Sequence, residues 1–586
     1  MLFGIILLYI KLLIKPNDST KKPKKHRLPP GPKPWPIVGN IPQMLANKPT
    51  FRWIQKIMND LDTEIACIRL GNIHVIPVTS PSIAREILMK QDTIFASRPL
   101  NWSSEHVSLG YLTTAITPFG EQWRKMKRVI TSELVSPLRL QWLHDKRAEE
   151  ADNLVRYVYN QCKNGNALVD LRFAGKHYGG NLIRRLFFNK RYFFGNGRED
   201  GGPGAEEVEH VEALLSVLNY LFAFSISDYV PLLREFDLDG QKEAMKKAIN
   251  TLRKYHDPII EERIHQWKNG IRTHQEDWLD VLISLKDANN NPFLTVDEIK
   301  SQLLEIMIAT IDNPYNNVEW VLSEMLNQPK LLQIAIEELD SVIGKERLVQ
   351  ESDIPKLNYV KACIREGFRL HPIVDFNIPH VSMKDTIVAN YFIPKGSHVL
   401  IRRQGIGQNP RVWEEPLKFK PERHLKKDGS NLTLTEPNLE LITFSTGRRS
   451  CPGITLGSTM TIMLFARLVH GFTWIAPPNE PIIDLSELES DTTKAKPLVL
   501  LGKPRLAEPN LELFTFGSGR RSCPAITLGS TMTIMLFVRL VHGFTWIAPP
   551  NESTIDLSEY ERDTTKAKPL VALGKPRLPV ENYHQI

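Results

Sequence analysis

Residues 444–453 read Phe444-Ser445-Thr446-Gly447-Arg448-Arg449-Ser450-Cys451-Pro452-Gly453, and they hold the strongest chemical signal in the chain. Cys451 lies between glycines, which let the backbone approach a flat group closely. Arg448 and Arg449 can hold a thiolate, and the apolar helix expected over 454–468 turns its positive end toward the sulfur. A buried cysteine is usually only a small apolar residue. This setting instead favours a thiolate that ligates a haem iron.

Length and composition are those of an ordinary globular protein. The 586 residues are 42% hydrophobic and 24% charged, enough for a core that can enclose a flat macrocycle. The net charge of +8 is modest, and no segment resembles a nucleic-acid tail, so we expect acidic partners or anionic lipid and no nucleic acid. The scattered cysteines form no CxxC pair, which argues against a disulfide framework or a zinc site; they are Cys67, Cys162, Cys363, Cys451 and Cys523.

The N-terminus carries the localising signal. Residues 2–14 are apolar except for Lys11, and a basic run follows as far as Arg27. This is shorter than the about 20 residues of a spanning helix, and a signal peptide or a disordered tail are the alternatives. The charges follow the apolar stretch and no cleavage site of small residues appears. We therefore expect residues 1–27 to be a membrane anchor with a cytosolic basic stretch, joined to the body by the proline-rich hinge 28–36.

The rest of the chain is expected to be mainly α with small β-sheets. Periodic apolar positions predict helices over most of 51–306, whereas strand-like runs are short: 67–70, 75–78 and 397–401. Residues 436–506 recur as 508–578, shifted by 72 positions with ten substitutions. Two copies are too few for a solenoid, so a partial duplication or a wrongly joined exon is the interpretation. The predicted domains are 28–506 and the duplicated segment with its tail, 507–586.

The complete F-x-x-G-x-R-x-C-x-G pattern resembles the cysteine loop of the cytochrome P450 superfamily, whose fold we therefore expect. By this resemblance Cys451 ligates the haem iron, while Phe444, Arg449 and Gly453 contact the haem. Further motifs agree. Glu366 and Arg369 resemble the family's E-x-x-R, and Arg423 lies in Pro421-Glu422-Arg423-His424, with His424 only 27 residues before Cys451. An i,i+3 ion pair on a solvated helix is the commoner meaning of E-x-x-R, but the order of the motifs predicts a buried Glu366–Arg369–Arg423 network.

The segment 123–128 resembles the family's W-x-x-x-R, which binds a haem propionate. Lys127 stands where arginine is usual, and lysine lacks the bidentate fork. The contact is therefore expected from Trp123 and Lys127, or to pass to Arg124 or Arg128. His380 matches a position whose arginine or histidine meets a propionate in plant relatives.

Asp312-Asn313-Pro314 occupies the place of the family's acid–threonine pair for oxygen activation, and these three residues are the expected catalytic group. Proline should interrupt one hydrogen bond and kink the helix. One interpretation of this altered segment is that the enzyme is degenerate and inactive. The other is a resemblance to the plant amino-acid N-monooxygenases that make aldoximes, which His424 and the segments 200–204, 237–240, 255–260 and 376–381 also match.

The resemblance implies two successive N-hydroxylations of an L-amino acid, followed by dehydration and decarboxylation to an aldoxime. It implies haem b with its iron, NADPH and O2 as co-substrates, and electrons from NADPH–cytochrome P450 reductase docking near Arg448 and Arg449. The catalytic domain would face the cytosol from the endoplasmic reticulum membrane. A haem-binding pseudoenzyme and a reductase-independent, peroxide-isomerising haem-thiolate enzyme are the alternatives. The cavity is expected around 101–117, 218–227 and 374–377.

The repeat supplies a second cysteine loop around Cys523, in which Ala525 replaces Gly453. Relatives tolerate alanine at that position, so the substitution does not exclude it. Connectivity favours Cys451, because use of Cys523 would require the intact first copy, with its apolar helix, to be looped out.

Overall fold

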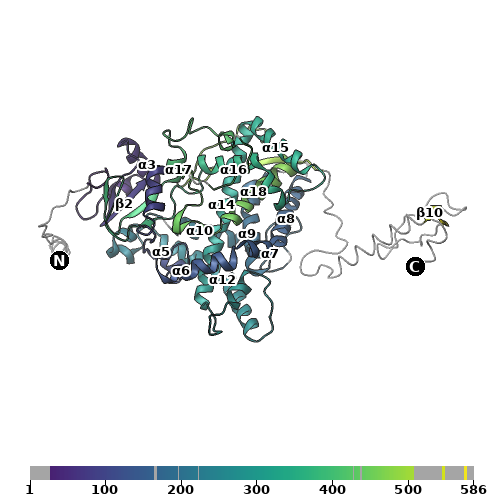
Figure 1. The fold of residues 1–586 in the computed structure, drawn as a ribbon, viewed down its shortest axis with the longest axis horizontal. Helices are drawn as coiled ribbons and strands as arrows, with labels where there is room; N and C mark the ends of the chain where they lie inside the picture. Colours follow the sequence, from purple (N-terminus) through teal and green to yellow (C-terminus); the bar gives the residue numbers. More distant parts are fainter. Residues whose placement is uncertain are drawn as a thin grey trace. The chain divides into compact units, whose positions relative to one another are not determined.

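The computed structural model describes residues 27–163, 168–195, 197–221, 223–426, 428–435 and 439–506, and the backbone of 544–547 and 573–576. Residues 1–26 of the expected anchor and the loop around Cys523 lie outside this part of the chain. The chain divides into two compact units, Met1–Pro509 and Asn510–Ile586, and each is treated by itself (Figure 1). The described cysteines are Cys67, Cys162, Cys363 and Cys451, and none of these four forms a disulfide.

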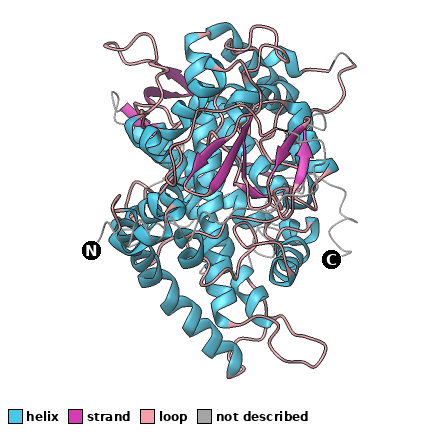
Figure 2. Ribbon diagram, turned by 90° about the vertical axis from the view of Figure 1, so that its left-hand side faces the viewer, coloured by secondary structure: helices cyan, strands magenta, loops and turns pink. Residues whose placement is uncertain are grey.

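The first unit is mainly helical, as the sequence predicts (Figure 2). The α-helices in chain order are α2 (Ile41–Ala46), α3 (Thr50–Asp60), α4 (Pro81–Arg85), α5 (Trp102–Val107), α6 (Glu121–Arg128), α7 (Pro137–Trp142), α8 (His144–Lys163), α9 (Leu171–Phe188), α10 (Ala205–Leu221), α11 (Ile226–Tyr229), α12 (Gln241–Lys268), α13 (Trp278–Ser284), α14 (Val296–Asn327), α15 (Pro329–Ile343), α16 (Asn358–Leu370), α17 (Arg403–Gly407) and α18 (Ile454–Gly471). The π-helical segments are η1 (Glu86–Lys90) and η2 (Val129–Leu134), and the 3₁₀ segments are η3 (Pro231–Phe236), η4 (Glu351–Lys356), η5 (Pro421–His424) and η6 (Gly447–Arg449).

Three small sheets accompany these helices. The largest has the order β1 (Ile68–Leu70), β2 (Ile73–Val78), β7 (His398–Ile401) and β4 (His380–Val381), with β2 and β7 parallel and His380 opposite Val399. The second pairs β3 (Leu168–Asp170) with β9 (Val499–Pro504) and β9 with β8 (Phe472–Ile475), and the third joins β5 (Thr386–Val388) to β6 (Tyr391–Ile393). Because β4 lies beside β7, the chain that leaves β7 runs close to His380.

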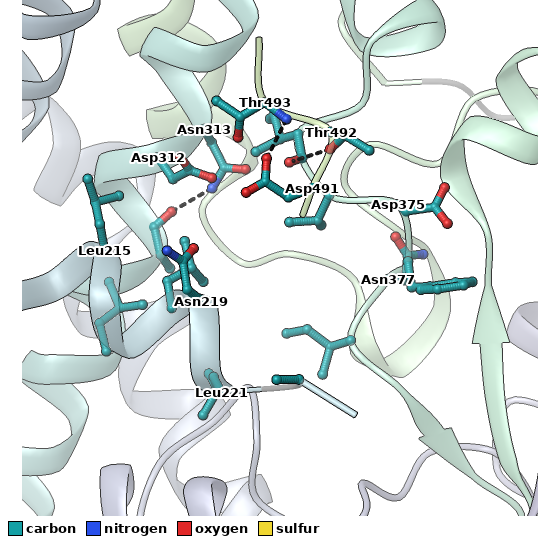
Figure 3. Close-up of a pocket in the computed structure, with 18 of the residues that line it drawn as sticks. Leu215, Asn219, Leu221, Asp312, Asn313, Asp375, Asn377, Asp491, Thr492 and Thr493 are labelled. Atoms are coloured by element: carbon teal, nitrogen blue, oxygen red, sulfur yellow. Dashed lines mark hydrogen bonds between the residues drawn. The ribbon is translucent and has the colours of Figure 1, made fainter. Parts of the chain in front are cut away.

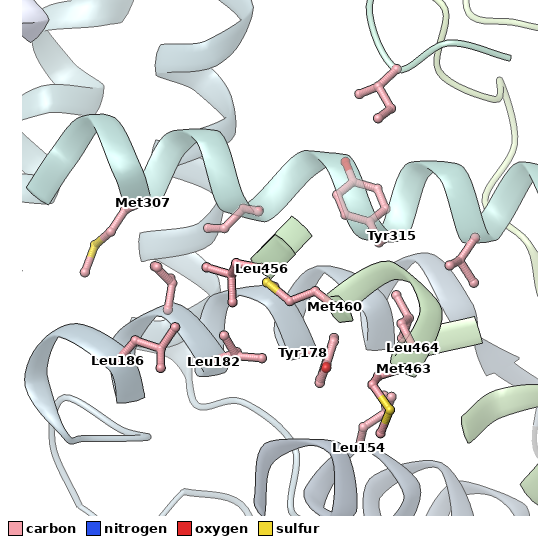
Figure 4. Close-up of a cluster of buried hydrophobic side chains, with 14 of the residues drawn as sticks. Leu154, Tyr178, Leu182, Leu186, Met307, Tyr315, Leu456, Met460, Met463 and Leu464 are labelled. Carbon is pink, nitrogen blue, oxygen red and sulfur yellow. The ribbon is translucent and has the colours of Figure 1, made fainter. Parts of the chain in front are cut away.

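Helices α8, α9, α14 and α18 form the centre of the core, where side chains such as Leu182, Met307 and Met460 interlock (Figure 4). Helix α14 begins with a capping box, in which Thr295 Oγ1 accepts from Glu298 N–H and the Glu298 carboxylate accepts from Thr295 N–H. Helix α18 is mostly apolar and largely buried, and its one charged side chain, Arg467, pairs with Asp152. By length and composition alone, α18 and the stretch Ala205–Tyr229 could cross a membrane, but 72% of α18 is buried in the protein.

The second unit repeats one feature of the first. Strand β10 (Phe544–Ile547) pairs antiparallel with β11 (Leu573–Pro576), and Phe544 lies opposite Pro576. In the first unit β8 and β9 place Phe472 opposite Pro504. The two pairings differ by a shift of 72 residues at all four positions, so the described strands of the second copy repeat the register of the first.

Candidate active site

The cysteine loop folds through η6 and ends at the N-terminus of α18. The Cys451 N–H donates to the Phe444 carbonyl at 2.9 Å, which closes the loop. Gly447 has φ +69°, and a side chain there would meet the Leu88 carbonyl oxygen at 2.1 Å, so only glycine fits. At Gly453 an added Cβ would lie 3.9 Å from Cys451 Sγ, an ordinary contact distance. Alanine is therefore sterically acceptable at that place in the loop.

Two cavities meet near this loop. The first, here called the cysteine pocket, has a volume of about 290 Å³ and is lined by Cys451, Phe444, Gly453, Trp123 and His380 among others. The second, here called the large cavity, has a volume of about 650 Å³ and lies between α10, α14 and the segments 373–379 and 488–493 (Figure 3). The expected cavity regions 101–117, 218–227 and 374–377 all contribute to its wall. Residues that line both cavities form their boundary: Ala115, Glu305, Ala309, Asn313, Ile373, Asn377, Ile378 and Arg403.

The cysteine pocket is lined by an excess of positively charged side chains. Arg98, Lys127, Arg403, Arg448 and Arg449 line it, whereas Glu305 is the one carboxylate among the lining residues. Burial lowers the pKa of Arg449 to about 9 and that of Arg98 well below its ordinary value. Buried cations are stable when they are paired with anions. A flat group that carries two carboxylates, as haem does, fits this set of donors around a cysteine.

Two guanidinium groups of this pocket, those of Arg98 and Arg449, are held in place by backbone carbonyls. Arg449 donates to Ala96, Thr114 and Thr117, and Arg98 donates to Ala115, Ile378 and Pro379. Arg449 is therefore buried rather than part of a docking surface. Arg448 is half-exposed and pairs with Asp92 at 3.2 Å.

Burial raises the pKa of the Cys451 thiol, and the Gly453 N–H, Lys127 and Arg403 lower it. Arg448 and Arg449, which the sequence offered for this role, have other partners: Arg448 pairs with Asp92, and Arg449 donates to the backbone carbonyls of Ala96 and Thr117.

Helix α6 presents one face to the cysteine pocket. Trp123 and Lys127, one turn apart, line it, and Lys127 Nζ donates to the Ser450 carbonyl at 2.9 Å. Arg124 and Arg128 are exposed, with guanidinium carbons 5.7 Å and 5.4 Å from the ring centres of Phe119 and Phe293. Arg124 and Arg128 each follow one of the two pocket-lining residues by one position. Because successive side chains of a helix differ in direction by about 100°, these two arginines do not line the pocket. His380 does reach it and donates from Nδ1 to the Phe95 carbonyl at 2.8 Å.

The charged network predicted from the motifs is assembled behind the loop. Glu366 accepts from Arg369 Nε and His424 Nε2 at 2.8 Å each, and from Arg423 Nε at 3.1 Å. Glu366 and Arg369 are completely buried. Burial by itself would raise the pKa of Glu366, but these hydrogen bonds outweigh it and lower the pKa to about 2. Helix α16 is thereby tied to η5, which leads to the cysteine loop.

Helix α14 brings the Asp312-Asn313-Pro314 segment to the boundary of the cavities. Asp312 is buried and accepts from Tyr315 Oη–H at 2.8 Å, and burial raises its pKa to about 6. Asn313 Nδ2 donates to the Ala309 carbonyl at 2.7 Å (Figure 3). The helix continues through Pro314, which has no N–H and so leaves the Thr310 carbonyl without its usual helical donor. This segment can hold a proton at Asp312 and offers polar atoms toward both cavities.

The cytochrome P450 family model matches residues 29–501 of the chain. The chain belongs to the cytochrome P450 family. It is a haem-dependent monooxygenase with the mainly helical fold of that family. The match ends before the second copy of the repeated segment.

Several curated P450 relatives align over most of their length. The chain is 57% identical to isoleucine N-monooxygenase 1 of Lotus japonicus, over 86% of this chain and 95% of the relative. It is 58% identical to a phenylalanine N-monooxygenase of Prunus mume, over 84% and 93%, and 53% identical to tyrosine N-monooxygenase of Sorghum bicolor, over 86% and 93%.

Reasoning from the sequence missed several residues of this P450 site. Arg98, Glu305 and Arg403 line the cysteine pocket, yet none was singled out. Charged residues are mostly on surfaces, so an arginine outside a recognised motif carries no signal of burial. The one available hint was the adjacent pair Arg402-Arg403 directly after a strand-like run.

Proposed function

We propose that this P450 hydroxylates the nitrogen of an L-amino acid twice and releases an aldoxime. The relatives at 53–58% identity are named as N-monooxygenases of isoleucine, phenylalanine and tyrosine. The observation that carries the proposal is the Asp312-Asn313-Pro314 segment at the boundary of the two cavities. It provides a buried acid and an amide where the family usually has an acid and a hydroxyl.

We further propose that Cys451 is the axial ligand of the haem iron. Phe444 and Gly453 would lie against the macrocycle, and Trp123, Lys127, His380 and Arg449 would hold its carboxylates. The bound haem supplies the activation of O2. The Glu366–Arg369–Arg423 network would support the loop from behind, because a fully paired buried network is rigid. In this scheme residues 28–506 are the P450 domain and 507–586 a duplicated segment with its tail.

The chain's own residues would manage protons and position. Asp312 can hold a proton near neutral pH and exchange it, because its raised pKa lies close to that range. Asn313 keeps its amide nitrogen on the Ala309 carbonyl, so its amide oxygen remains available to a substrate amine or an ordered water. Together they would replace the missing threonine hydroxyl.

Electrons are proposed to come from NADPH through NADPH–cytochrome P450 reductase, docking on the side of the molecule where Arg448 is exposed. Anchoring by residues 1–27 would hold the enzyme on the endoplasmic reticulum membrane with its catalytic domain in the cytosol. The apolar stretch followed by the basic run supports this proposal.

The test is expression in microsomes with the reductase, followed by incubation with a panel of L-amino acids and measurement of aldoximes. We expect at least one aldoxime, formed only with NADPH and O2. A normal reduced carbon-monoxide spectrum without turnover of any amino acid would indicate a pseudoenzyme instead. Conversion of a hydroperoxide without NADPH would indicate the isomerising class.

A further inference from the structure

Arg403 occupies a special position at the boundary of the two cavities. It follows β7 as the first residue of α17, and it lines both the large cavity and the cysteine pocket. Its backbone N–H donates to the Asp375 carbonyl at 2.6 Å, and its Nε donates to Asn377 Oδ1. The first contact holds the backbone at the start of α17, and the second holds the guanidinium at its Nε, so the two terminal nitrogens are not used by Asn377.

The guanidinium has no anionic partner in the described part of the chain. Within those residues no carboxylate forms an ion pair with Arg403, and no group accepts a hydrogen bond from its terminal nitrogens. Asp375, in the neighbouring segment, is instead bound by Arg402 Nε at 2.8 Å. Burial lowers the pKa of Arg403 to about 10, although the charges of Cys451 and Asp375 act in the opposite direction.

Asn377 adds an unused donor beside it. The residue is 3% exposed and lines both cavities, and its Nδ2 makes no hydrogen bond with a described residue (Figure 3). Because Asn377 Oδ1 accepts from Arg403, the donating nitrogen is the atom left over. A buried donor without a partner is costly and marks a place for an acceptor.

We propose that Arg403, oriented by Asn377, binds the α-carboxylate of the amino-acid substrate. Two parallel N–H groups of a guanidinium match the two oxygens of a carboxylate. The substrate nitrogen is attached to the adjacent carbon atom. A carboxylate held at the boundary therefore keeps the nitrogen beside the cysteine pocket, near Asn313, while the side chain extends into the large cavity. The inference rests on the proposed amino-acid substrate and names the residue that recognises its carboxylate.

Other cations of the large cavity are less suited. Arg172 is bound by the Glu319 carboxylate at 2.8 Å. Lys176 lies with its Nζ 5.6 Å from the centre of the Tyr315 ring, and it lines the large cavity without lining the cysteine pocket. A carboxylate at either place would hold the amino acid farther from Cys451.

The test compares binding of probes with and without a carboxylate. Full-length wild type and the variants Arg403→Gln, Arg403→Lys and Lys176→Gln are titrated with L-isoleucine and L-phenylalanine, and with L-isoleucinamide and L-phenylalaninamide, and the shift of the haem spectrum is recorded. For Arg403→Gln we expect the Kd of the amino acid to rise about 30-fold, and the Kd of the amide to stay as in wild type. Arg403→Lys should recover part of the loss, because lysine keeps the charge without the fork.

The inference would be overturned by an equal effect on amino acid and amide, or by no effect on either. It would also be overturned if Lys176→Gln alone caused the selective loss. Loss of bound haem in both Arg403 variants, seen in the reduced carbon-monoxide spectrum, would assign Arg403 to the haem carboxylates. Wild type that makes aldoxime while Arg403→Gln binds normally refutes only this inference, whereas wild type without aldoxime refutes the proposed function.

Discussion

Replacing Glu366 with glutamine tests the network behind the cysteine loop. One carboxylate here accepts hydrogen bonds from Arg369, Arg423, His424 and the Lys420 N–H. Its pKa is lowered from 4.5 to about 2 by these partners. At 1.36 kcal/mol per unit, this difference corresponds to about 3 kcal/mol of folding free energy. Removing one partner of a buried ion pair typically costs a similar amount, about 3–5 kcal/mol.

The pH dependence has a definite sign. Because the folded-state pKa lies below the unfolded value, the stabilisation is complete well above pH 4.5 and is lost as the pH falls from 4.5 through about 2. Wild type should therefore lose about 3 kcal/mol of stability across this range, whereas Glu366→Gln, already destabilised at neutral pH, should show a flatter profile.

The assay is urea unfolding of the holoenzyme at a series of pH values, followed by tryptophan fluorescence and by the reduced carbon-monoxide spectrum. Glu422→Gln is the matched control, since Glu422 is exposed in the same η5 segment and accepts one hydrogen bond, from Tyr359 Oη at 3.1 Å. Its unfolding free energy should change by about 0.5 kcal/mol. A loss of less than about 1 kcal/mol in Glu366→Gln at neutral pH would refute the assignment of a stabilising buried network.

Three further outcomes are expected. Cys451→Ser should abolish the thiolate spectrum of the reduced carbon-monoxide complex, and a surviving signal would assign the iron to Cys523. Asn313→Thr should lower the aldoxime formed per NADPH consumed, because the amide oxygen is lost; unchanged coupling and product would contradict the role of Asn313. Leu488, which lines the large cavity, corresponds to Tyr560 in the second copy. Leu488→Tyr puts a larger side chain into the cavity wall. With valine and phenylalanine offered together, we therefore expect relatively more aldoxime from valine. An unchanged ratio would show that this position does not select the side chain.

The local geometry of the cysteine loop could be predicted from the sequence because its parts are close together in the chain. Gly447, Cys451 and the N-terminus of α18 form one continuous stretch, whose local geometry follows from residue type. The Glu366–Arg369 pair is likewise local, one helical turn apart. The prediction that Arg423 joins this pair rested on the resemblance to known motifs, because Arg423 is distant in the sequence.

Tertiary structure decided which charges act at the site. The sequence offers Arg124, Lys127, Arg448 and Arg449 as equivalent cations, but packing turns Lys127 inward and Arg124 to solvent. Arg403 enters the site only because β7 pairs with β2 and β4, which places the end of that strand between the cavities. The effect of an arginine depends on its distance from water and from other charges. Neither is a property of the local sequence, so the anion-binding character of this boundary emerges only when the chain is folded.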